Sequence, residues 1–146
     1  MYQPSVFTWI LAATSLVTFF PLMGAQLLML LKPNSRKTKD LIIGKGSEWR
    51  DNTHFKSALA FAWADWMVIF PLLVLGNIGV LCGQSWGYVL WLALGVLSVY
   101  FSILFWVLEK EYTYPKCGWF AYYTYFWGFF LYWGIAAIIY SLMVLI

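Results

Sequence analysis

The chain has 146 residues, of which 63% are hydrophobic and 22% aromatic, while only 10% are charged. A soluble domain carries about 25% charged residues, and a chain of this length could not bury so much apolar surface away from water. The composition therefore excludes a water-soluble globular protein and predicts an integral membrane protein whose main partner is the lipid bilayer. By its length the chain is one domain, residues 1–146.

Four apolar stretches are each long enough to cross the hydrocarbon core of a bilayer, which is roughly 30 Å thick and takes about 20 helical residues. They lie near residues 6–31, 57–82, 87–108 and 119–144. The strands of a membrane barrel would show alternating segments of about ten residues, whereas these stretches are apolar on every face. The sequence thus predicts an all-α integral membrane protein, a four-transmembrane-helix bundle with up-down topology.

The basic residues predict an orientation. All nine Lys and Arg lie in the first and third connections between the apolar stretches, and seven of them lie in the loop 32–56. With four spans these two connections share one side of the membrane. The positive-inside rule makes that side cytoplasmic and places both termini outside. We expect the membrane to be a bacterial inner (plasma) membrane.

The first apolar stretch contains Pro21, with Gln26 just beyond it. A proline inside a helix removes one backbone hydrogen bond, so we expect a kink at this point. Gln26 would lie about one turn inside the inner boundary of the membrane. A buried amide at that depth needs a hydrogen-bond partner.

The basic loop 32–56 has a net charge of +4 when His54 is neutral. Two interpretations stay open: the charge only determines topology, or it also contacts anionic headgroups, to which each basic residue contributes roughly 1 kcal/mol. The basic residues are not interleaved with an aromatic platform, so we expect no nucleic-acid partner. Thr53 is the expected N-cap of the following helix.

The second apolar stretch contains a single acidic residue, Asp65. A charged group at membrane depth costs several kcal/mol, so it is normally paired, protonated or turned toward a polar cavity. On a regular helical wheel Asp65 shares a stripe with Leu72, Gly76 and Gly79. We therefore expect Asp65 to face protein rather than lipid, because small residues let helices approach closely. The stripe fits either a packing seam within the chain or an interface of a homo-oligomer.

One face of the helix expected for the third stretch carries Trp91, Gly95, Ser98, Ser102 and Phe105. Glu109 continues this face to the inner boundary of the membrane. The fourth stretch is rich in aromatic residues, and buried phenol groups need hydrogen-bond partners. Tyr122 and Tyr125 would lie at a depth similar to that of Gln26 and Asp65. We therefore predict a buried polar cluster of these four residues, with Glu109 at its inner mouth, as the candidate site for a ligand or a proton.

Three functions are compatible with such a cluster. It could brace a non-catalytic subunit of a larger membrane complex, or form a binding module for a lipophilic, cationic small molecule. The alternative is a small proton-linked transporter that uses Asp65. The apolar stretches hold no histidine for haem, and the loops show no metal-ligand spacing. We accordingly expect no catalytic residue, cofactor or metal site, and favour a protein that is not an enzyme.

Overall fold

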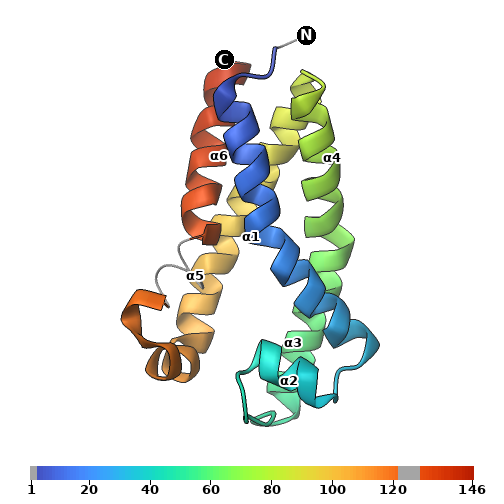
Figure 1. The fold of residues 1–146 in the computed structure, drawn as a ribbon, viewed down its shortest axis with the longest axis vertical. Coiled ribbons are helices and arrows are strands. Elements are labelled where there is room, and N and C mark those ends of the chain that lie inside the picture. Colours follow the sequence, from blue (N-terminus) through green and yellow to red (C-terminus); the bar gives the residue numbers. More distant parts are fainter. Residues whose placement is uncertain (1–2, 122–128) are drawn as a thin grey trace. The chain divides into compact units, whose positions relative to one another are not determined.

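The computed structural model describes residues 3–121 and 129–146, with only the backbone described for 108–121, and all of its described elements are helical (Figure 1). These are α1 (Val6–Leu31), α2 (Arg36–Ile42), α3 (Asn52–Ala64), the π-helical turn η1 (Asp65–Ile69), α4 (Phe70–Leu81), α5 (Ser85–Ala121) and α6 (Phe129–Leu145). The chain forms two compact units, each described by itself. Unit 1 comprises Met1–Thr18 and Leu72–Ile146, and unit 2 comprises Phe19–Pro71.

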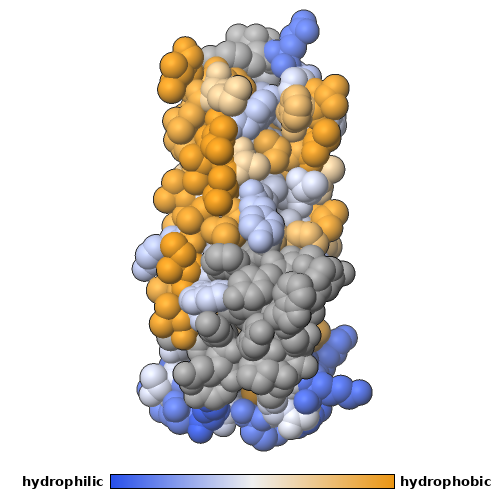
Figure 2. Space-filling view, turned by 90° about the vertical axis from the view of Figure 1, so that its left-hand side faces the viewer, coloured by the Kyte–Doolittle hydropathy of each residue, from blue (hydrophilic) through white to orange (hydrophobic). Residues whose placement is uncertain are grey.

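Three helical segments are long and apolar enough to cross a membrane: Val6–Leu31, Asn52–Leu81 and Ser85–Val107. The apolar helix α6 has 17 residues, fewer than the roughly 20 that a crossing takes. Hydrophobic side chains cover much of the described helical surface on the face shown in Figure 2, as contact with lipid requires. The structure therefore supports an all-helical membrane protein, while the count of four spans stays a prediction.

The first helix has the predicted bounds, and its ends have clear local causes. Ser5 and Thr8 form a reciprocal capping box, in which each side-chain oxygen accepts the backbone N–H of the other residue, at 3.3 and 3.2 Å. The helix ends at Leu31, two residues before Pro33, because the residue before a proline disfavours the helical conformation. Pro21 lies within the helix, which continues past it.

The second and third helices differ from their predicted bounds. The prediction that Thr53 is the N-cap is wrong, because Asp51 caps α3. The Oδ1 atom of Asp51 accepts the backbone N–H of His54 at 2.8 Å. The helix α5 continues to Ala121, whereas we expected a connection after residue 108. One proline removes only one backbone hydrogen bond, and α5 runs through Pro115.

The fourth apolar stretch does not begin where it was predicted. Residues 119–121 are the end of α5, and the next described helix, α6, begins at Phe129. Residues 122–128 between them lie outside the described part of the chain. The predicted range 119–144 therefore corresponds to a described helix only from Phe129 onward.

Glycines set the spacing of the helices in unit 1. The helices α5 and α6 lie side by side and antiparallel (Figure 1), and a Cβ atom added to Gly95 would lie 2.8 Å from the carbonyl oxygen of Gly134. A Cβ atom on Gly79 of α4 would lie 2.5 Å from the Cα atom of Gly87 of α5. Backbones this close leave no room for a side chain. Gly83 has another role, since its φ of 68° closes α4 in a left-handed turn.

The π-helical turn η1 changes which residues of Asn52–Leu81 are buried. The backbone N–H of Phe70 donates to the carbonyl of Asp65, five residues back instead of four. Such a turn adds one residue, which offsets the following positions by about 100° around the axis. Leu73 is accordingly buried where the regular wheel placed Leu72, which is only half-buried. Asn77 is buried as well, which the wheel did not predict.

Candidate functional site

The candidate site is the pair of Asp65 and Gln26, both in unit 2. Asp65 is the first residue of η1 and is 6% exposed, and Gln26 lies in the last third of α1 and is 5% exposed. Their side chains are hydrogen-bonded to each other. The structure therefore brings together two polar residues that are 39 positions apart in the sequence.

Apolar residues surround the pair along both helices. On α1 the buried positions one turn to either side of Gln26 are Met23 and Met29, and on the other helix Ala62 and Ile69 flank Asp65 in the same way. Each polar group thus interrupts an otherwise apolar buried face. In such surroundings an unpaired polar group costs about 1–3 kcal/mol, so the hydrogen bond between them is the interaction that makes their burial acceptable.

Within the described part of the chain, no buried cation neutralises the carboxyl group of Asp65. Among the residues whose side chains the structure describes, the buried polar and charged set contains no lysine and no arginine. A carboxyl at membrane depth without a cationic neighbour has to be neutral or has to receive a cation from elsewhere. Asp65 is thus a group whose charge is not fixed by the described residues around it.

An amide is the partner that suits such a carboxyl, because it offers both a donor and an acceptor. The neutral acid form of Asp65 can donate its O–H to the Oε1 atom of Gln26. The carboxylate form can instead accept an N–H from Nε2 of the same side chain. A lysine or arginine in place of Gln26 would stabilise only the carboxylate. The pair can therefore hold Asp65 in either charge state.

The backbone at Asp65 is also irregular. The π-helical turn begins at this residue, and Pro71 follows two residues after the turn ends. Pro71 has no N–H to donate, and in a regular helix its ring would crowd the carbonyl of Met67. The buried indole Nε1 of Trp66, next to Asp65, has no hydrogen-bond partner among the described residues. Single π-helical turns are frequent at functional sites, and this one carries the acid itself.

The other predicted site residues cannot be placed beside this pair. Tyr122 and Tyr125 lie outside the described residues. Glu109 lies in the part of α5 for which only the backbone is described. Of the five candidates, the structure brings together Gln26 and Asp65.

Two polar contacts of unit 1 were not predicted. The Nδ2 atom of Asn77 donates to Ser15 Oγ at 3.1 Å and to the carbonyl of Leu73 at 2.9 Å. The hydroxyl of Tyr140 lies 2.8 Å from Thr8 Oγ1 and joins α6 to the start of α1. Polar residues within apolar runs were the signal that could have found these positions. A regular helical wheel does not predict that Asn77 is buried, because the π-helical turn changes the face of the helix on which this residue lies.

Comparison of the chain with known protein families, curated proteins and solved structures found no match. What the chain does has to be inferred from its own residues.

Proposed function

We propose that this chain is a non-catalytic membrane binding module in which Asp65 and Gln26 bind the positive group of a lipophilic, cationic small molecule. One observation carries this proposal. The two residues form a hydrogen-bonded pair that is buried among apolar side chains, without a buried cation among the described residues. A carboxyl with a fixed structural role would more simply be paired with a basic residue or replaced by an apolar one.

The proposed binding step is an exchange of cations. In the free protein Asp65 is a neutral acid that donates its proton to Gln26 Oε1. When the ligand arrives, the proton leaves to water and the carboxylate pairs with the cation of the ligand. The amide of Gln26 turns over and donates an N–H to the carboxylate. Charge is conserved at the site, because one positive charge leaves as another arrives.

Two other functions share parts of this chemistry. If the exchange were coupled to movement across the membrane, the chain would be a small proton-linked transporter. If no ligand bound, the pair would be a brace inside a subunit of a larger membrane complex or homo-oligomer. The irregular turn at Asp65 favours a binding site over a brace, because a brace gains nothing from a helix that has lost backbone hydrogen bonds.

We also propose a four-span topology with the loop 32–56 in the cytoplasm and both termini outside, in a bacterial inner membrane. The distribution of the nine basic residues supports it. Single cysteines at Ser47 and Ser85 should react with a membrane-impermeant reagent from opposite sides. Reaction of both from one side would contradict the proposed topology.

Binding of radiolabelled tetraphenylphosphonium, a lipophilic cation, tests the proposed function. The purified protein in detergent should bind it more tightly as the pH rises, because the cation competes with a proton. Asp65→Asn should abolish the binding, while its hydrogen bond to Gln26 is retained. Asp51→Asn is the matched control, since it removes an exposed carboxylate and Asn is an equally good N-cap. Equal binding by the two variants would refute the proposal.

A further inference from the structure

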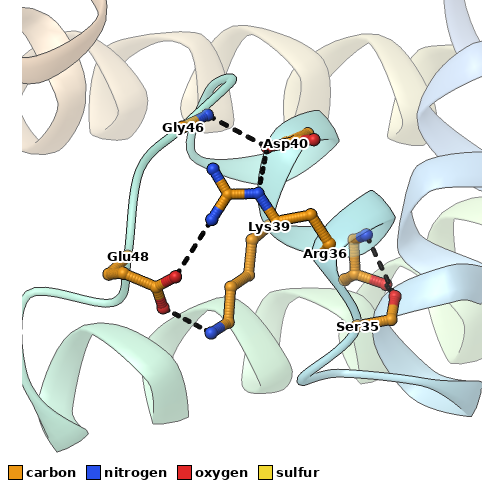
Figure 3. A network of polar contacts seen from close by, with 7 residues as sticks. Ser35, Arg36, Lys39, Asp40, Gly46 and Glu48 are labelled. Carbon is orange, nitrogen blue, oxygen red and sulfur yellow. Dashed lines mark hydrogen bonds and ion pairs between the residues drawn. The ribbon is translucent and has the colours of Figure 1, made fainter.

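The basic loop 32–56, which joins α1 to α3 and includes the first five residues of α3, has an internal framework of charge pairs. Arg36 Nε lies 3.2 Å from Asp40 Oδ1, and its Nη1 lies 3.0 Å from Glu48 Oε1, while Lys39 pairs with the other oxygen of Glu48 (Figure 3). The backbone N–H of Gly46 donates to Asp40 at 3.0 Å. These contacts tie the segment after α2 back onto α2. They also neutralise two of the seven basic residues of the loop.

The third acidic residue of the loop, Asp51, is committed to capping α3. The structure shows no ion pair for the exposed lysines among the side chains that it describes: Lys32, Lys37, Lys45 and Lys56. The acidic residues of the loop are therefore engaged in contacts within the loop. The lysines without an ion pair remain exposed at its surface.

The loop is held close to the ends of two candidate membrane spans. It follows α1 directly and leads into α3 after nine residues beyond α2. The hydroxyl of Thr38, a fully buried residue of α2, donates to the carbonyl of Lys32 at 2.7 Å. This contact fastens α2 to the end of α1. The short helix therefore stays at the level where α1 leaves the apolar part of the bilayer.

The outer face of α2 combines charge with an apolar side chain. Lys37 and Leu41 are four residues apart, so they lie on the same face of this helix. Both are exposed, Leu41 by 54%, while Thr38 is turned inward. A lysine beside an exposed leucine is typical of a helix at a membrane interface, where the apolar side chain enters the headgroup boundary and the ammonium group stays at the phosphates.

We propose that the exposed lysines of this loop, with Leu41 inserted between the lipids, bind the headgroup phosphates of acidic lipids in the membrane that the chain spans. The charge is complementary, and the attachment of α2 to α1 keeps these lysines within reach of the headgroups. The charge pairs of Arg36 and Lys39 hold the loop in shape and do not bind lipid. This site is independent of Asp65.

Energy transfer from the ten tryptophans to dansyl-labelled lipids in mixed micelles tests the proposal. The wild type should prefer dansyl phosphatidylglycerol to dansyl phosphatidylcholine. Removing one lysine should weaken binding of the acidic lipid roughly fivefold, so Lys37→Gln with Lys45→Gln should lose about 25-fold. Replacement of the same two lysines by Arg should retain the preference, which shows that the loss is due to charge and not to misfolding.

A charge-neutral control separates lipid binding from the loop framework. Lys39→Gln with Glu48→Gln removes both ion pairs of Glu48 without changing the net charge and leaves Arg36 paired with Asp40. This variant should keep the preference for the acidic lipid. Inorganic phosphate should not compete at millimolar concentration. The proposal is overturned if the wild type shows no preference, if the Lys37/Lys45 Gln variant keeps it, or if free phosphate displaces the lipid.

Discussion

Replacing either member of the buried pair by leucine should destabilise the protein, and the two losses should not add. Asp65→Leu leaves the amide of Gln26 without its partner at a position that is 5% exposed, so water cannot take over the hydrogen bond. Gln26→Leu likewise leaves the buried carboxyl group of Asp65 without its hydrogen-bond partner. In the double variant neither polar group is left, and a part of the loss should return.

The size of the effect follows from the environment. A buried polar group that loses its partner costs about 1–3 kcal/mol. Measured couplings between hydrogen-bonded side chains in membrane proteins average about 0.6 kcal/mol and reach about 1.7 kcal/mol. We expect each single leucine variant to lose about 1–2 kcal/mol of unfolding free energy. The coupling should exceed the average of about 0.6 kcal/mol and approach the upper value of about 1.7 kcal/mol, because each group has one polar partner among the side chains that the structure describes.

Reversible unfolding in mixed micelles, followed by tryptophan fluorescence, gives the four free energies of this cycle. Asp65→Asn serves as the control that keeps a hydrogen bond, and should change the unfolding free energy by less than about 0.5 kcal/mol. Additive single losses, or an Asp65→Asn variant as unstable as Asp65→Leu, would refute the reasoning that the hydrogen bond holds these residues together.

Three further predictions concern the packing and the polar contacts. Gly95→Ala should lower the thermal midpoint of unfolding, because the added Cβ atom would lie 2.8 Å from a backbone oxygen. Gly24 has open space around it, so Gly24→Ala should leave the midpoint unchanged or raise it. Equal effects of the two substitutions would contradict the close approach at Gly95. Tyr140→Phe should cost about 1 kcal/mol by removing a hydroxyl bonded to α1, and Tyr132→Phe, at a side chain that is 58% exposed, should cost almost nothing; a reversed order would be evidence against the contact. The hydrogen bond from Lys39 lowers the pKa of Glu48. The Glu48 carboxylate therefore stabilises the loop fully above the ordinary pKa of glutamate, and this stabilisation is lost as the pH falls through the lowered value. An NMR titration of the Glu48 carboxyl carbon should show a midpoint below the ordinary one.

The sequence predicted those features that depend on composition and on local caps. The first helix was predicted near residues 6–31 and spans Val6–Leu31, because its apolar run coincides with the helix between the capping Ser5 and Pro33. The start of the next helix was missed, because Asp51 caps it within a polar segment and the helix begins before the apolar run. The length of α5 was missed because the predicted range followed the apolar run, which ends near residue 108, whereas the helix continues through the polar residues beyond it and through Pro115.

The candidate site, too, could be predicted from the sequence only in part. Gln26 and Asp65 stand out in the sequence as polar residues within apolar runs, and similar depth was enough to predict them as neighbours. A helical wheel assumes a regular helix, so it could not predict which residues beyond the π-helical turn are buried. Asn77 lies beyond that turn, which is why its contact with Ser15 became visible only in the structure.

The central claim, that Asp65 exchanges a proton for a cation, is tested most directly by counting the protons released on binding. Titration calorimetry of tetraphenylphosphonium in two buffers of different ionisation enthalpy gives this number. The account predicts the release of close to one proton for each cation bound by the wild type at a pH where Asp65 is still neutral, and no binding by Asp65→Asn. Cation binding without proton release, or binding that survives in Asp65→Asn, would contradict it.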